Sequence, residues 1–142
     1  MKDKLTIVKV GGKIVEDESS LDVLLHGFAA IDGFKLLVHG GGRSATAMAS
    51  RLGIETVMID GRRVTDSDML RIVTMVYAGS VNKNIVARLQ AMGVDALGMT
   101  GADMNIFLSR TRKAAPGDYG WVGEPVAVND GALASLLQAG VV

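Results

Sequence analysis

Short apolar runs alternate with longer amphipathic runs over the first part of the chain. Residues 5–10 (LTIVKV) and 34–39 (FKLLVH) are aliphatic and each ends at glycines, which predicts two strands. Residues 21–31 and 43–53 follow them and read as helices, the second closed by Gly53. The order strand, helix, strand, helix predicts an α/β fold with parallel strands in its sheet.

Two capping patterns predict where helices begin. Ser19 and Thr65 are each followed three positions later by an acidic residue, a pattern typical of helix N-termini. Apolar residues then recur at helical spacing as far as Met92. We therefore expect one long helix after Thr65, with a bend at Gly79.

The remaining runs predict two hairpins, one further strand and a final helix. Asp60-Gly61 lies between short strand-like runs, which is typical of a hairpin turn. A second hairpin is expected from the runs on either side of residues 115–120, and a helix is expected to begin at Asn129 or Asp130. The expected strands are residues 55–59, 62–65, 94–100, 106–113 and 121–128. Val141-Val142 resembles the beginning of another strand, so we interpret the chain as part of a longer one.

Composition narrows the class of protein. The chain has 142 residues, 49% of them hydrophobic, which suits one domain or part of one. Fifteen basic and fifteen acidic residues cancel, and no Lys/Arg run indicates nucleic-acid binding. The absence of cysteine excludes disulfides and thiolate metal sites, and two histidines are too few for a His-rich one. No signal peptide or membrane-length apolar run occurs, so a cytoplasmic protein without a metal site or membrane contact is the expectation.

Two glycine turns are the main candidates for a binding site. Gly11-Gly12 follows the first predicted strand, and Gly40-Gly41-Gly42 follows the second. Ligands of open α/β sheets bind at the carboxyl ends of the strands, where bare backbone N–H groups can converge on an anion. Neither turn matches the dinucleotide fingerprint or a Walker A loop. Together they predict one shared anion site.

Two cations, Lys9 and Arg63, are further candidates for binding an anionic ligand. Lys9 stands inside the first strand, where an unpaired charge is costly to bury, and it is positioned to reach an anion over the first turn; a solvent-facing lysine is the alternative. Arg63 can pair with a carboxylate through two hydrogen bonds, although a surface arginine is the more common case. Arg62 faces the other side of its strand. We interpret His39 as a strand-end structural residue and Asp103 as part of a loop turn.

The segments KVGG, VHGGG and GRRVTD, in this order and spacing, resemble the amino acid kinase family, and YAGSVNKNIVARL and ALGMTGADMN are also similar to it. The resemblance implies a three-layer α/β/α sandwich with a mainly parallel sheet. Residues 1–142 would be its amino-terminal, substrate-binding part. The carboxy-terminal half, which binds ATP in this family, would be missing.

Within the family, the motifs most resemble the members that use ATP and Mg²⁺ to phosphorylate the side-chain carboxylate of N-acetyl-L-glutamate in arginine biosynthesis. The positions that match the family's ligand-binding motifs are Lys9, Gly11, Gly12, Gly40, Gly41, Gly42 and Arg63. The resemblance implies that Lys9 neutralises the transferring phosphoryl group, and that the first turn and Gly40 bind phosphate. Gly41 and Gly42 would bind the substrate, and Arg63 would hold its α-carboxylate.

Some features leave alternatives open. Arg62 stands where many relatives carry leucine and Asp60 where some carry asparagine, so an N-succinyl-L-glutamate substrate is a second possibility. A non-catalytic fragment that binds a small carboxylate or phosphate is a third. A dinucleotide-binding half would carry an acidic residue at position 39, where this chain has histidine. The family's long N-terminal helix, linked to hexamers, does not precede the first strand, so the complete enzyme is expected to be a homodimer and the fragment alone inactive.

Overall fold

The structure is a computed structural model that describes residues 4–113 and 118–142. Its centre is a parallel pair of strands, β1 (Leu5–Val10) and β2 (Phe34–His39), with the bounds that the sequence predicts. Leu5 lies opposite Phe34 and Val10 opposite His39. The two strands therefore end together, and the glycine turns that follow them leave the same edge of the sheet.

Helices surround this pair. They are α1 (Gly12–Glu16), α2 (Glu18–Ala29), α3 (Gly42–Arg51), α4 (Ser67–Thr74), the π-helix η1 (Met75–Val81), α5 (Asn82–Ala91), the 3₁₀-helix η2 (Asp103–Asn105) and α6 (Asp130–Gln138). The short helix α1 was not predicted. The buried core cluster comes from α2, α3 and the α4–η1–α5 run; its members are Leu21, Leu25, Phe28, Ala45, Ala49, Met69, Ile72, Val76, Val81, Ile85 and Leu89.

The two predicted N-caps are wrong by one or two residues. The Asp17 carboxylate, not Ser19, caps α2 by accepting a hydrogen bond from Ser20 N at 2.7 Å. The Asp66 carboxylate, not Thr65, caps α4 by accepting one from Met69 N at 2.8 Å. In both places a carboxylate occupies the N-cap, where its negative charge also faces the positive end of the helix dipole.

The long helix predicted from residue 65 to Met92 is continuous but not uniform. It passes from α4 through the π-helical turn η1 into α5. Gly79 lies inside η1, so the glycine coincides with a change of hydrogen-bond pattern. π-helical turns frequently occur at functional sites.

Both predicted hairpins are present. In the first, β3 (Met58–Ile59) pairs with β4 (Arg62–Arg63), and Asp60 and Gly61 have φ values of 47° and 74°. Two positive φ values suit a type I′ turn, the conformation that an Asp-Gly pair favours. The second joins β5 (Phe107–Thr111) to β6 (Gly123–Val128). Part of its predicted turn, residues 115–117, lies outside the described residues.

The predicted strand at residues 94–100 is wrong: this segment has no regular structure. Within the described residues β2 pairs only with β1, so no neighbouring ladder orders the segment. It forms two backbone hydrogen bonds with the end of the chain, from Val142 N to Asp95 O (2.9 Å) and from Leu97 N to Val142 O (2.8 Å). This is the bonding pattern of a parallel bridge, in keeping with the strand-like character expected of Val141-Val142.

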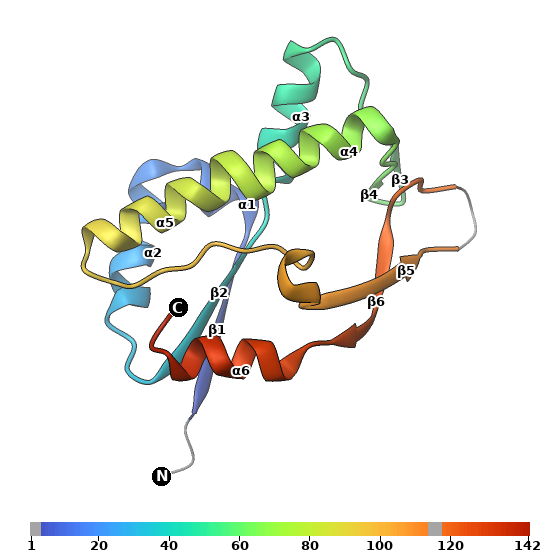
Figure 1. Cartoon of the computed structure of the whole chain (residues 1–142). Helices are drawn as coiled ribbons and strands as arrows, with labels where there is room; N and C mark the ends of the chain where they lie inside the picture. Colours follow the sequence, from blue (N-terminus) through green and yellow to red (C-terminus); the bar gives the residue numbers. More distant parts are fainter. Residues whose placement is uncertain (1–3, 114–117) are drawn as a thin grey trace.

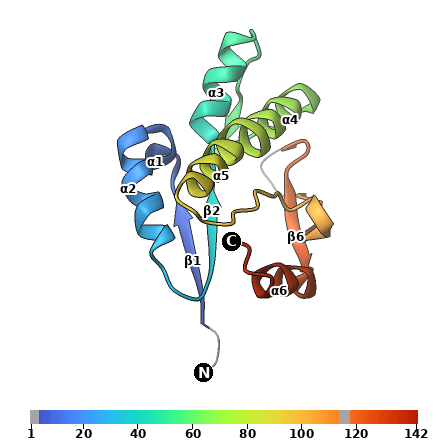
Figure 2. The same ribbon diagram turned by 60° about the vertical axis from the view of Figure 1, so that its left-hand side comes forward.

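The layers follow the predicted α/β arrangement. Figure 2 shows α1 and α2 on one side of the β1–β2 pair and α6 on the other, while α4, η1 and α5 form one diagonal run in Figure 1. The two hairpins are joined where Thr65 bridges to Gly120. In the described part of the chain, no helix has the length and hydropathy needed to cross a membrane.

Candidate functional site

Both glycine turns lead directly into helices at the carboxyl end of the parallel pair. Gly11 is the N-cap of α1, and Gly41 is the N-cap of α3. The Ser44 hydroxyl on α3 donates to the Glu16 carboxylate on α1 at 3.2 Å, which links the two helices. The structure therefore places the two turns side by side, as the sequence predicts.

The space around the turns differs from residue to residue. At Gly11, Gly12 and Gly40 a Cβ atom would meet nothing within 4 Å. At Gly41 a Cβ would lie 2.9 Å from the Tyr77 ring. The first three positions are therefore open to an approaching group, whereas Gly41 is bare because an aromatic side chain packs against it.

Arg63 lies at the N-terminus of α3, twenty-one residues from Gly42 in sequence. Its Nη2 donates to the Gly42 carbonyl and to the Thr46 hydroxyl, both at 2.8 Å. Its Nη1 lies 3.4 Å from the Thr56 hydroxyl. These acceptors are neutral, so the guanidinium is fixed in place while its positive charge has no carboxylate partner among the described residues.

The π-helix η1 packs against the second turn. The sequence does not predict this contact. Tyr77 and Val81 both reach Gly41, and a Cβ on Gly42 would lie 3.5 Å from the Tyr77 hydroxyl. Tyr77 thus borders the turn with its ring against Gly41 and its hydroxyl near Gly42. The apolar spacing of this region predicts only a helix, and no local pattern distinguishes a π-helical turn.

Lys9 lies on β1 opposite Val38 of β2 and is exposed. Its neighbours Val8, which packs against the core cluster, and Val10, which is buried, lie on one face of the strand, so strand alternation places Lys9 on the other face. No salt bridge involves Lys9 within the described residues. The ammonium is therefore free to approach an anion from that face, although the structure does not fix it against either turn.

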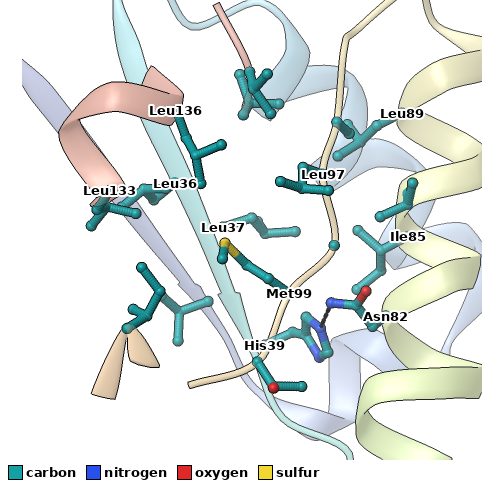
Figure 3. A pocket seen from close by; sticks show the side chains of 18 of the residues that line it. Leu36, Leu37, His39, Asn82, Ile85, Leu89, Leu97, Met99, Leu133 and Leu136 are labelled. Atoms are coloured by element: carbon teal, nitrogen blue, oxygen red, sulfur yellow. Dashed lines mark hydrogen bonds between the residues drawn. The ribbon is translucent and has the colours of Figure 1, made fainter. Parts of the chain in front are cut away.

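A hydrogen-bonded network lies behind the second turn, at His39. One ring nitrogen, Nδ1, is 3.0 Å from the Gly40 carbonyl, and the other, Nε2, is 3.0 Å from Asn82 Nδ2 (Figure 3). Lys83 Nζ donates to Asn82 Oδ1 at 3.1 Å and to the Gly98 carbonyl at 2.8 Å. His39 therefore connects the glycine turn with α5 and with the segment at residues 94–100.

A cavity of about 400 Å³ opens beside this network, and Tyr77 lines it as well as the second turn. Figure 3 shows leucine side chains from β2, α5 and α6 around it, with His39 and Asn82 at one end. A dicarboxylate or phosphate would lose its hydration in such a lining without gaining partners. The cavity is thus less suited to the expected ligand than the glycine turns are.

Acidic groups do not suggest a metal site. No group of three or more His, Asp or Glu residues gathers within residues 4–113 and 118–142. Asp103 accepts hydrogen bonds from Thr100 N at 2.6 Å and from its hydroxyl at 2.8 Å. The backbone bond, then the hydroxyl bond, lower the pKa of Asp103. This agrees with the interpretation of Asp103 as part of a loop turn.

Comparison with known proteins adds to this geometry. The chain is 62% identical over its whole length to the acetylglutamate kinase of Phocaeicola vulgatus, and 37% identical to that of Methanopyrus kandleri over 97% of the chain. It spans only 55% of each of these relatives. The chain therefore corresponds to about half of the curated proteins that it matches.

Solved structures agree on the fold. A protein of Streptococcus mutans, smu.665, superposes with a TM-score of 0.78 at 20% identity, covering 96% of this chain and 56% of that one. The N-acetylglutamate synthase of Neisseria gonorrhoeae, complexed with coenzyme A and N-acetyl-glutamate, superposes with a TM-score of 0.75 at 22% identity, covering 97% and 32%. The sequence profile described as "Amino acid kinase family" matches residues 4–142. The chain belongs to the amino acid kinase family.

Proposed function

We propose that this chain is the substrate-binding part of an ATP-dependent kinase that phosphorylates the side-chain carboxylate of N-acetyl-L-glutamate. The observation that carries the proposal is Arg63, whose guanidinium is held 2.8 Å from the Gly42 carbonyl at the start of α3. A fixed cation beside bare backbone N–H groups at a helix N-terminus suits a carboxylate ligand. The relatives named acetylglutamate kinase support this choice of substrate.

Each site residue then has a role. Arg63 binds the α-carboxylate of the substrate, and the N–H groups of Gly41 and Gly42 donate to its oxygens. Gly11 and Gly12 of the first turn and Gly40 of the second face the phosphoryl group, and an added Cβ at each of the three would meet nothing within 4 Å. Lys9 neutralises the charge that gathers on that group. Such preorganised donors typically lower a barrier by about 2.7–4 kcal/mol each.

The reaction needs positioning more than acid–base chemistry. An oxygen of the side-chain carboxylate attacks the γ-phosphorus of ATP, the bond from phosphorus to the β–γ bridging oxygen breaks, and ADP leaves. A glutamate carboxyl has a pKa of about 4.3, so the nucleophile is already ionised near neutral pH and no general base is required. Mg²⁺ would supply neutralisation of the phosphate charge, and by its usual preference would be held largely by the phosphates of ATP.

N-succinyl-L-glutamate is a second candidate substrate. This candidate rests on the residues at positions 60 and 62 of the hairpin that carries Arg63, where many relatives differ; Arg62 itself is exposed on the opposite face of β4. A non-catalytic carboxylate-binding role is the third candidate. Each of the three predicts a different result in one assay.

The assay joins this chain to the part of the Phocaeicola vulgatus relative that follows the matched region. Acyl phosphate is trapped with hydroxylamine in the presence of ATP, Mg²⁺ and either acyl-glutamate. We expect acetylglutamate-dependent hydroxamate that falls at least about 100-fold in Lys9→Met. If the chimera prefers N-succinyl-L-glutamate, the proposed substrate would have to be changed to that compound. A folded chimera that binds ATP but phosphorylates neither would contradict the kinase assignment and leave only a binding role.

The complete enzyme is proposed to be a cytoplasmic homodimer. We expect the 142-residue chain itself to bind acyl-glutamate weakly and to transfer no phosphoryl group. Light scattering on the chimera tests the assembly, and a hexameric mass would contradict it.

A further inference from the structure

Asn82 has a buried side-chain amide that caps no helix. Its residue is only 6% exposed, and it lies within the continuous helical run from η1 into α5, where no N-cap is needed. Its side chain instead points toward β2 and contacts His39 (Figure 3). A buried polar group is retained at some cost in desolvation, so these contacts call for an explanation.

The protons of this network can be assigned from chemistry. The Lys83 ammonium has only donors, so the Asn82 atom that it meets must be the oxygen, and the other end of the amide must be the NH₂ group. That NH₂ donates to His39 Nε2, which therefore carries no proton. The proton of a neutral ring then resides on Nδ1, where the Gly40 carbonyl accepts it at 3.0 Å.

This tautomer determines how the Gly40–Gly41 peptide is oriented. In a planar trans peptide the C=O and N–H bonds point in opposite directions. Because the His39 ring holds the Gly40 carbonyl, the N–H of Gly41 is directed away from that ring. No backbone acceptor for it occurs among the described residues.

We propose that Asn82, itself oriented by Lys83, is a positioning residue that selects the His39 tautomer and so aims the Gly41 N–H at the carboxylate ligand. This deepens the proposed function and rests on it. The geometry of Gly98 supports the assignment: Lys83 donates to its carbonyl, and a Cβ at residue 98 would overlap the Asn82 side-chain oxygen. The bare backbone at that position leaves room for the amide.

The test is ¹⁵N spectroscopy of the two imidazole rings in the labelled chain, above the pH at which they are protonated. We expect His39 as the Nδ1–H tautomer, while the exposed His26 serves as an internal reference. In Asn82→Asp a carboxylate can only accept, so His39 should carry its proton on Nε2. N-acetyl-L-glutamate should then bind about tenfold more weakly, as expected for one lost hydrogen bond.

Two further variants keep the test decisive. Asn84→Asp changes an exposed amide on the same helix and should alter neither the tautomer nor the affinity. Lys83→Met changes an exposed residue, so it should fold even where Asn82→Asp does not, and it should give a mixture of His39 tautomers.

Three outcomes would overturn the inference or separate it from the proposed function. An Nε2–H tautomer in the unmodified chain would contradict the proton assignment. A switched tautomer with unchanged affinity would show that Asn82 is structural only, while the proposed function stands. No acetylglutamate binding by the unmodified chain would contradict the proposed ligand, and the tautomer spectrum would still decide the network.

Discussion

Tyr77 and Gly41 illustrate how a residue distant in sequence shapes the site. A Cβ on Gly41 would lie 2.9 Å from Tyr77 Cδ1 and 3.4 Å from Val81 Cγ2. The φ of Gly41 is 172°, outside the left-handed region that favours glycine. Close packing, rather than backbone conformation, therefore explains why this position is glycine.

Gly41→Ala should destabilise the chain by about 1–3 kcal/mol, the usual cost of overpacking. Gly40→Ala is the matched control, because a Cβ there meets nothing within 4 Å. Urea unfolding of both variants measures the difference. Equal unfolding free energies would show that Tyr77 does not pack against Gly41 as described.

At the scale of elements, helix caps explain where α2 and α4 begin. The sequence contains several candidate caps close together around the start of α4, namely Thr65, Asp66 and Ser67. The capping-box pattern predicts Thr65, a hydroxyl followed by an acidic residue. In the folded chain the cap is the Asp66 carboxylate, which accepts from Met69 N. Cap choice depends on the path of the preceding chain, here the bridge from Thr65 to Gly120, which the local pattern does not contain.

Asp66→Ala should lower the free energy of unfolding by about 1 kcal/mol, the typical cost of a lost N-cap. Asp68→Ala removes an exposed ion pair to Arg71 at 3.6 Å and an exposed carboxylate in the first turn of α4, and should cost less, about 0.5 kcal/mol. Thermal or urea unfolding distinguishes the two. A larger loss in Asp68→Ala would contradict the assignment of the cap.

Two carboxylates should make stability depend on pH. Hydrogen bonds from the Ser20 hydroxyl and N–H, then from the Ser19 hydroxyl, lower the pKa of Asp17 below 3.8, and the Thr100 bonds do the same for Asp103. A carboxylate whose pKa is lower in the folded than in the unfolded chain stabilises the fold at pH values above its unfolded-state pKa. This stabilisation is lost as the pH falls through its folded-state pKa. The free energy of unfolding should therefore fall more steeply from pH 5 to 2 in the unmodified chain than in an Asp17→Asn, Asp103→Asn variant. Equal slopes would contradict this.

At the scale of the whole molecule, the strands and both hairpins are predictable because their signals are local. The strands of the parallel pair match residue for residue, and the Asp-Gly turn has the expected positive φ values. The predicted strand at residues 94–100 is absent, because a strand-like sequence forms a strand only when a neighbouring strand supplies hydrogen-bonding partners. The π-helical turn and the placement of Arg63 against Gly42 likewise depend on tertiary contacts.

The site follows the same division. The glycine turns and Lys9 are predictable from the strand ends alone. Tyr77 packs against the second turn from the long helical run, and Asn82 contacts it only through His39. Nothing in their own segments marks them as site residues. The chain spans about half of its curated relatives, and the roles proposed for its residues, in binding an acyl-glutamate and a phosphoryl group, concern that half only.

The most direct measurement is a titration of the ¹⁵N-labelled chain with N-acetyl-L-glutamate, followed through its backbone amide signals. We expect saturable shifts at Gly41 and Gly42, with affinity reduced about 10- to 150-fold in Arg63→Gln, as expected for the loss of a charged hydrogen bond, and little changed in Arg62→Gln. Saturable binding that leaves the signals of Gly41 and Gly42 unmoved, or that is equally strong in Arg63→Gln, would contradict the proposed site.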